Sequence, residues 1–165
     1  MSIPAITQIM NEIEARLANI AIANGYNFDL KKITRSKSGD FQNGDLPEVD
    51  FFVQDVTITG QKFNKDLKQA VIFFRCFTNK TDKKALSDVS ALLAADFVMA
   101  LDRDILSPLV SDPRSRDLGG LVNRFYQTGE EYLIGDLSRP WAGVDMSFTA
   151  EFSTPIGDPY TIELI

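Results

Sequence analysis

Asp66–Thr78, "DLKQAVIFFRCFT", is the stretch that decides the fold. Val71 and Phe73 fall on one side of an extended chain, and Ile72 and Phe74 fall on the other. A half-exposed strand alternates apolar with polar residues, whereas a strand that is apolar on both sides is typical of a sheet centre. The pattern therefore predicts a central strand that is covered on both faces.

Other strand patterns lie on either side of this one. Before it, "YNFDLKKITR" (26–35) alternates apolar residues, and "EVDFFVQDVTITG" (48–60) begins just after Pro47 and is rich in β-branched and aromatic residues. After it come "LVNRFYQTGEEYLIG" (121–135), which suits a strand or a hairpin, and "WAGVDMSFTAEFS" (141–153), which alternates from Val144 to Phe148. These segments predict strands joined mostly by short turns.

Two segments have helical periodicity. Apolar residues recur at intervals of three and four over 3–23, after a possible cap at Ser2 and before the stop signal Asn24-Gly25. A second stripe, from Leu86 to Leu101, predicts a helix over 82–106. The order of elements predicts an α+β fold: a mainly antiparallel sheet with two principal helices packed on one face. We expect a single domain over 1–165, with a mobile loop at 36–46 and an extended C-terminal tail at 153–165.

The composition limits the chemistry. The chain has 165 residues, a net charge of −6, one cysteine and no histidine. Histidine triads, imidazole metal sites and disulfides within the chain are excluded, so an enzyme built from it would need carboxylates, lysines or tyrosines. Cys76 lies in an apolar strand and is expected to be a small buried side chain. The lack of disulfides, of a signal-peptide pattern and of a long apolar run indicates a reducing cytoplasm and no membrane association.

Two metal sites can be considered from the sequence. A calcium loop starting at Asp40 fails, because its glycine falls at position 5 where the EF-hand requires it at position 6. A metal-dependent nuclease is the alternative function that stays open: Asp50 or Asp55 on one strand, with Asp66 and Lys68 on the next, would gather Mg²⁺ through carboxylate oxygens. Otherwise we predict no enzyme activity, no metal and no cofactor.

Two neighbouring blocks of opposite charge are candidates for an interface between copies of the chain. The proposed interface residues are the basic Lys31, Lys32, Arg35 and Lys37 and the acidic Glu48, Asp50 and Asp55. Between the blocks lies a loop that we expect to face a partner or a lumen and to be poorly ordered in the isolated subunit: Asp40, Phe41, Gln42, Asn43 and Asp45.

Several stretches together resemble the phage tail terminator family of tail-completion and neck proteins. They are "ANGYNFDLKKITR" (23–35), "LPEVDFFVQD" (46–55), "ALDRD" (100–104), "LGGLVNRFYQTGEEY" (118–132) and "FSTPIGDPY" (152–160). The resemblance covers nearly the whole chain and rests on short structural motifs, so it transfers roles for regions and no catalytic residues.

The resemblance implies a structural virion protein of the tail or neck. Such a subunit forms a hexameric ring, caps the completed tail tube, ends tail polymerisation and joins the tail to the head connector or neck protein. Its partners would be itself and the tail tube protein, and DNA would pass through the ring without specific binding. A monomeric host-side adaptor with the same α+β fold is a further possibility that the sequence leaves open.

Overall fold

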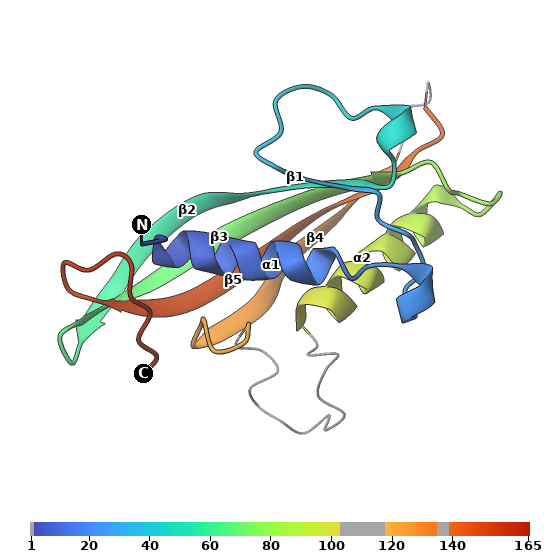
Figure 1. Ribbon diagram of the computed structural model, residues 1–165. Helices are drawn as coiled ribbons and strands as arrows, with labels where there is room; N and C mark the ends of the chain where they lie inside the picture. Colours follow the sequence, from blue (N-terminus) through green and yellow to red (C-terminus); the bar gives the residue numbers. More distant parts are fainter. Residues whose placement is uncertain (1, 103–117, 135–138) are drawn as a thin grey trace.

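The computed structural model describes residues 2–102, 118–134 and 139–165 (Figure 1). Helix α1 (Ala5–Leu17) is followed by the short 3-10 turn η1 (Ile22–Asn24), strand β1 (Lys32–Arg35) and a second turn, η2 (Asn43–Asp45). Strands β2 (Glu48–Lys62) and β3 (Lys65–Thr78) precede helix α2 (Leu86–Asp102). Strands β4 (Arg124–Ile134) and β5 (Ala142–Pro155) complete the sheet.

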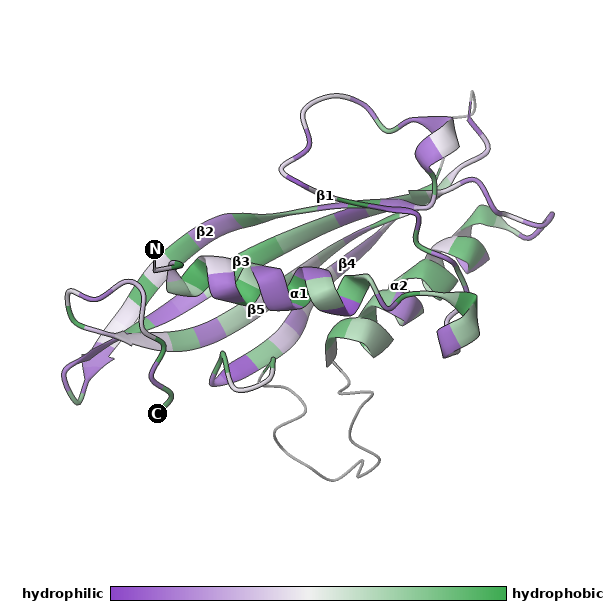
Figure 2. Cartoon of the chain, viewed as in Figure 1, coloured by the Kyte–Doolittle hydropathy of each residue, from purple (hydrophilic) through white to green (hydrophobic). Residues whose placement is uncertain are grey.

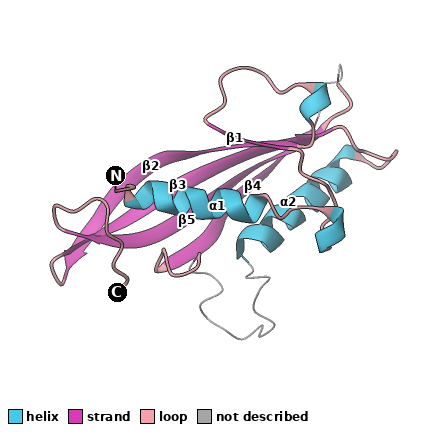
Figure 3. Cartoon of the chain, viewed as in Figure 1, coloured by secondary structure: helices cyan, strands magenta, loops and turns pink. Residues whose placement is uncertain are grey.

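The strands form one five-stranded sheet in the order β1-β2-β3-β5-β4. Only β1 is parallel to its neighbour, and the other pairs are antiparallel. The stretch that predicted the centre of the sheet is indeed the middle strand, since β3 pairs along its length with both β2 and β5. Both principal helices lie on one face of this sheet (Figure 3), which confirms the predicted α+β class.

The core lies between the sheet and the two helices. Phe51, Phe74 and Phe148 come from three adjacent strands, and their rings stand 5.7 and 5.4 Å apart between centroids. Phe97 of α2 contacts Phe74 at 6.3 Å, and Phe125 of β4 stacks on Phe148 at 5.1 Å. Large buried aromatic rings dominate core energetics, so this chain of rings ties four strands to α2.

The first helix is shorter than predicted, and the second begins later than predicted. The first was expected over 3–23, but α1 begins at Ala5 without a side-chain cap from Ser2 and ends at Leu17. The apolar spacing extends past the end of α1 because Ile20, in the turn after the helix, is also buried. Its carbonyl accepts a hydrogen bond from Leu30 N. The second helix begins at Leu86, and its predicted end at 106 lies outside the described residues. Within the described ranges, neither helix has the length and apolar character needed to cross a membrane.

Only the last part of the segment 26–35 is a strand, and the buried carboxylate of Asp96 gives the reason. It accepts hydrogen bonds from the backbone N–H groups of Asn27 and Phe28, each at 3.0 Å, and from Asn27 Nδ2 at 2.7 Å. Burial raises the pKa of Asp96, while these hydrogen bonds act in the opposite direction. Tyr26 and Phe28 are therefore buried by a turn fixed to α2, which the alternation alone does not reveal.

The face of the sheet opposite the helices is largely open, so the prediction that the central strand is covered on both faces was wrong for this side. Phe73 is only half-buried there, and Arg75 is exposed. Cross-strand contacts replace a second layer: Phe73 packs on Phe52 at 5.4 Å, and the Arg75 guanidinium pairs with Asp145 at 2.7 and 2.5 Å. Aromatic and charged pairs of this kind stabilise a sheet without covering it.

The C-terminal segment packs back on the molecule. Strand β5 continues to Pro155, so the first residues of the predicted tail belong to the sheet. Beyond it, Glu163 N donates to Ser153 O at 3.0 Å, and Glu163 pairs with Lys65 at 3.2 Å. Near the start of α1, Ala5 N donates to Pro159 O at 2.9 Å. These contacts hold both ends of the chain beside the turn between β2 and β3 (Figure 1).

Candidate interaction surfaces

Residues of the basic block pair with carboxylates of the loop and of the acidic block inside one subunit. Lys32 Nζ lies 2.5 Å from Asp45 Oδ2, and Lys37 Nζ lies 2.5 Å from Glu48 Oε1. The hydrogen bond with Asp45 raises the pKa of Lys32, and the same bond lowers the pKa of Asp45. Parallel pairing of β1 with β2, which sets Lys32 beside Glu48 at the start of both strands, brings the two charged segments side by side.

Other members of the blocks also have partners within the chain. Arg35 reaches Glu14 of α1 at 2.5 Å and Asn11 at 2.8 Å. Asp50 accepts hydrogen bonds from Lys37 N at 2.8 Å and from Thr34 Oγ1 at 3.2 Å.

This leaves few block residues without a partner. Among the described residues, no ion pair is formed by Lys31 or Asp55 of the blocks, or by Asp40 of the loop between them. Contact between the two blocks across copies stays a prediction, but most of the charge it would use is already paired within the subunit.

The Lys37–Glu48 pair differs from its neighbour because it is buried. The Glu48 side chain has 0% exposure and the Lys37 side chain 12%, whereas those of Lys32 and Asp45 are 42% and 36% exposed. The Lys37 ammonium also lies 5.0 Å from the centre of the Phe41 ring. Oε2 of Glu48 is buried without a hydrogen-bond partner, so Lys37 is the main compensation for this carboxylate.

The loop before β2 is anchored at its middle. The Phe41 ring meets Phe77 of β3 edge-on, with centroids 4.9 Å apart. Asn43 Oδ1 accepts hydrogen bonds from Trp141 Nε1 at 3.2 Å and from Asn79 Nδ2 at 2.9 Å. The mobility of residues 36–46 stays a prediction. Movement of the loop would have to break its contacts with Phe77, Asn79 and Trp141.

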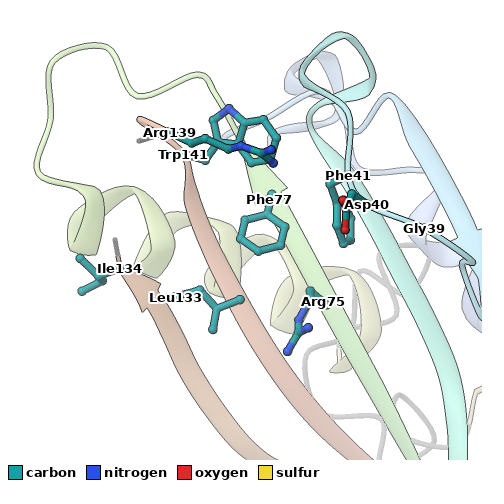
Figure 4. Close-up of a pocket in the computed structure, with 9 residues that line it drawn as sticks. All are labelled: Gly39, Asp40, Phe41, Arg75, Phe77, Leu133, Ile134, Arg139 and Trp141. Atoms are coloured by element: carbon teal, nitrogen blue, oxygen red, sulfur yellow. The ribbon is translucent and has the colours of Figure 1, made fainter. Parts of the chain in front are cut away.

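A pocket of about 560 Å³ lies where the loop meets the open face of the sheet (Figure 4). The Phe77 ring forms its floor, Phe41 and Asp40 stand on one side, and Leu133 and Ile134 of β4 stand on the other. The remaining lining comes from Gly39, Arg75, Arg139 and Trp141. The pocket is thus mainly aromatic and aliphatic, with one carboxylate and two guanidinium groups at its margins.

Gly143 makes room for the pocket floor. It pairs with Phe77 across β3 and β5. A Cβ atom at this position would lie 2.5 Å from Phe77 Cδ1 and 3.1 Å from the backbone oxygen of Cys76. The ring position therefore depends on the absence of a side chain in the neighbouring strand.

The opposite end of the molecule collects exposed apolar side chains. Its three segments, the N-terminal residues, the β2–β3 hairpin and the C-terminal tail, are joined by hydrogen bonds such as Ile156 N to Asn64 O at 3.1 Å. Of the eleven exposed large apolar side chains in the described residues, eight lie in these segments: Ile3, Val56, Ile58, Phe63, Ile156, Tyr160, Leu164 and Ile165. Apolar colour is visible at this end, around the labels of both termini (Figure 2). We refer to these eight residues as the hairpin-end surface.

Phe63 is the most exposed of these side chains, at 75%. It occupies the two-residue turn between β2 and β3, where Phe63 and Asn64 have φ of 51° and 61°. Such turns favour asparagine and glycine, and a bulky residue with positive φ is an outlier. Of the described residues, only Lys62 is found in ring contact with Phe63, its ammonium 5.0 Å from the ring centre.

The nuclease residues are not brought together. Asp50 pairs with Arg75 and Asp55 with Val71 in the β2–β3 register. Asp66 is therefore nine residues along β3 from the partner of Asp50 and five from the partner of Asp55, about 30 and 16 Å. Across the described ranges, no group of three or more potential ligand residues is placed to hold a metal ion.

Cys76 is buried, as predicted, and burial raises the pKa of its thiol. Its side chain belongs to the hydrophobic core between the sheet and the helices. The cysteine therefore serves packing, with its thiol held in the protonated form.

Sequence reasoning missed the hairpin turn and the pocket. The strand patterns ended at Gly60 and resumed at Asp66, so Phe63 was left unassigned. In the structure the strands are longer, and a two-residue turn joins them as a hairpin. Trp141 was read only as part of a strand, and Arg139 was not considered. The pocket itself joins four distant segments, 39–41, 75–77, 133–134 and 139–141, and no local pattern predicts that meeting.

No protein-family model matches the sequence, and no curated protein matches it at a significant level.

Proposed function

We propose that this chain is a structural subunit of a phage tail. In this role it forms a ring that caps the tail tube, ends tail polymerisation and joins the tail to the head connector or neck protein. The role requires no catalysis and places the protein in the virion. Its support is the resemblance over nearly the whole sequence together with the α+β fold that the resemblance implies.

The hairpin-end surface is the observation that carries the proposal. A subunit that works alone has no use for eight exposed large apolar side chains gathered at one end. Exposed apolar patches are typical of surfaces that another protein covers. A tail component needs such a surface for contact with tube or connector subunits.

A closed ring requires two unlike surfaces on each subunit. Cyclic assemblies with more than two copies repeat one head-to-tail contact, so the surfaces need not be alike but must be complementary. The hairpin end and the loop end lie at opposite ends of the same sheet and differ in chemistry, as this kind of contact demands (Figure 1).

The overall charge of the chain supports DNA passage more strongly than the charge of the loop does. A conduit should not neutralise phosphates, since each neutralised phosphate adds affinity through counterion release. The net charge of −6 opposes such binding. Within the loop, Asp45 already pairs with Lys32 of the same subunit, which leaves Asp40 as the loop carboxylate without an ion pair among the described residues.

The test is capping of growing tail tubes. The purified chain is added to the tail tube protein of the same phage during polymerisation, and tube lengths and ends are measured by electron microscopy. We expect shorter tubes with a ring-shaped density at one end. Tubes of unchanged length with bare ends would refute the proposal.

A matched pair of variants links the result to the surface. Ile58→Asp places a charge on the hairpin-end surface, and Ile22→Asp changes a similarly exposed isoleucine elsewhere; their exposures are 57% and 59%. We expect Ile58→Asp to reduce capping and Ile22→Asp to behave as the wild type. Equal behaviour of both variants would remove the hairpin-end surface from the mechanism.

A further inference from the structure

We propose that copies of this chain join head to tail, with Phe63 of one copy inserted into the pocket bounded by Phe41, Phe77 and Trp141 of the next. The inference rests on the proposed ring and names the contact that builds it. It also assigns an occupant to the pocket, a second copy of this chain.

The turn between β2 and β3 exposes the Phe63 ring at the cost of an unfavourable backbone conformation. A phenylalanine with φ of 51° replaces the residues that such a turn favours, which is a local cost, and among the described residues the Lys62 ammonium is the one ring contact found for Phe63. Strained positions of this kind cluster at functional sites. Strand pairing on both sides constrains the backbone of this two-residue turn, so little backbone entropy is lost when the ring binds.

The pocket suits an aromatic ring with a lysine beside it. Phe77 and Trp141, 6.1 Å apart between ring centroids, offer apolar surfaces for stacking or edge contacts. Arg139 lies 4.9 Å from the centre of the Trp141 ring, where its guanidinium can cover a further ring. Asp40 has no ion pair among the described residues and is available to the ammonium of Lys62, the neighbour of Phe63.

Phe63 cannot reach the pocket of its own chain. Lys65, just after the turn, and Phe77, on the pocket floor, are twelve residues apart along the same strand, about 40 Å. Only another copy can bring the two together. We refer to the turn that carries Phe63 as the tip. Because the tip and the pocket differ, each contact leaves one free tip and one free pocket, and repetition gives a ring when the rotation closes.

The experiment uses one variant on each side of the contact. Phe63→Ser removes the ring from an exposed turn, and Ile134→Arg places a bulky cation at the pocket margin from a side chain that is 57% exposed. Neither change touches the core. Ile22→Ser is the matched control for an exposed apolar side chain outside both surfaces.

Sedimentation velocity over a range of concentrations gives the first readout. We expect the wild type and Ile22→Ser to form the same oligomer. Each of the other variants should raise the dissociation constant roughly 30-fold or more, as loss of an interface hot spot does.

An equimolar mixture gives the sharpest test. Phe63→Ser keeps an intact pocket and Ile134→Arg keeps an intact tip, so the mixture can make one productive contact and should form a one-to-one dimer that grows no further. A contact that pairs like surfaces would not give this complementation.

Trp141 supplies an independent signal because it is the only tryptophan in the chain. Insertion of Phe63 should remove water from the indole, so the emission of the wild type should shift to shorter wavelength as concentration rises. Phe63→Ser should lack this shift.

The inference is overturned if the wild type stays monomeric at every concentration, if Phe63→Ser assembles normally, if Ile134→Arg assembles normally, or if assembly leaves Trp141 emission unchanged. The proposed function fails separately. Tube capping without tip-dependent assembly would refute the inference alone, and tip-dependent oligomers that do not cap tubes would refute the function alone.

Discussion

Two projections flank strand β2, and they use their side chains in opposite ways. Strand β1 and the loop before β2 carry a dense set of charged residues, but Lys32, Lys37 and Arg35 find carboxylates within the same subunit. The turn after β2 has little charge, yet it exposes Phe63 with hardly any contact inside the chain. A segment rich in charged residues is thus a weaker sign of a binding partner than one apolar side chain that is left exposed.

The largest effect should come from breaking the buried pair of the loop. Lys37→Met leaves the Glu48 carboxylate buried without its cation, which we expect to lower the free energy of unfolding by about 3 kcal/mol. Urea denaturation followed by circular dichroism measures this. Lys32→Met, which removes the exposed pair, is the control and should leave the midpoint nearly unchanged. Equal losses in both variants would show that burial does not distinguish the two pairs.

A smaller loss should follow from crowding the pocket floor. Gly143→Ala places a methyl group against the Phe77 ring and the Cys76 carbonyl, so we expect about 1–3 kcal/mol of destabilisation. Gly129→Ala is the matched control in the adjacent strand, since its nearest neighbour atom would be Ser147 Oγ at 3.7 Å. Thermal unfolding of both variants tests this, and a Gly143→Ala protein as stable as the control would contradict the geometry.

The hairpin turn should give an effect of opposite sign. Phe63→Asn with Asn64→Gly installs the sequence that a turn with two positive φ values favours. We expect the free energy of unfolding of the monomer to rise by about 0.5–1 kcal/mol while assembly is lost. Denaturation at low concentration and sedimentation at high concentration separate the two properties. A variant that is destabilised, or that still assembles, would argue against a turn kept for display.

The smallest effect concerns salt. If the tip and the pocket carry the contact, assembly should weaken only slightly from low to high ionic strength, because salt screens the Lys62–Asp40 pair but not the apolar burial. Assembly through the two charge blocks would instead weaken steeply. Sedimentation at both ionic strengths decides this, together with the double substitution Lys31→Glu and Lys32→Glu. A strong response to salt and to charge reversal would restore the charge-block interface.

The elements of the sheet and its helices could be predicted because their signals are local. The two-sided apolar pattern of Asp66–Thr78 identified the central strand, and apolar spacing located both helices. The contacts between these elements depend on how the strands pair. The pairing of Lys32 with Asp45 and of Lys37 with Glu48 depends on β1 lying parallel to β2, which the sequence did not reveal.

The candidate site was less predictable than the fold. The sequence singled out the loop as a partner-facing or lumen-facing region, which stays a prediction, and Phe41 and Asp40 of this loop line the pocket. Its other walls come from β3, β4 and the residues before β5, which become neighbours only after the sheet has formed. The same limit hid the turn at Asn27, because its determinant, Asp96, is 69 residues away in the sequence.

That distance has a consequence for how the chain reaches its native state. Asp96 binds the N–H groups of the segment that leads into β1, so this segment cannot settle until α2 has been made and has docked. During synthesis, β2 and β3 can pair as a local hairpin long before then, since their turn is only two residues long. The loop end of the molecule is thus expected to form late and the hairpin end early. A subunit that is still folding would show its tip before its pocket, and assembly would wait for the slower of the two.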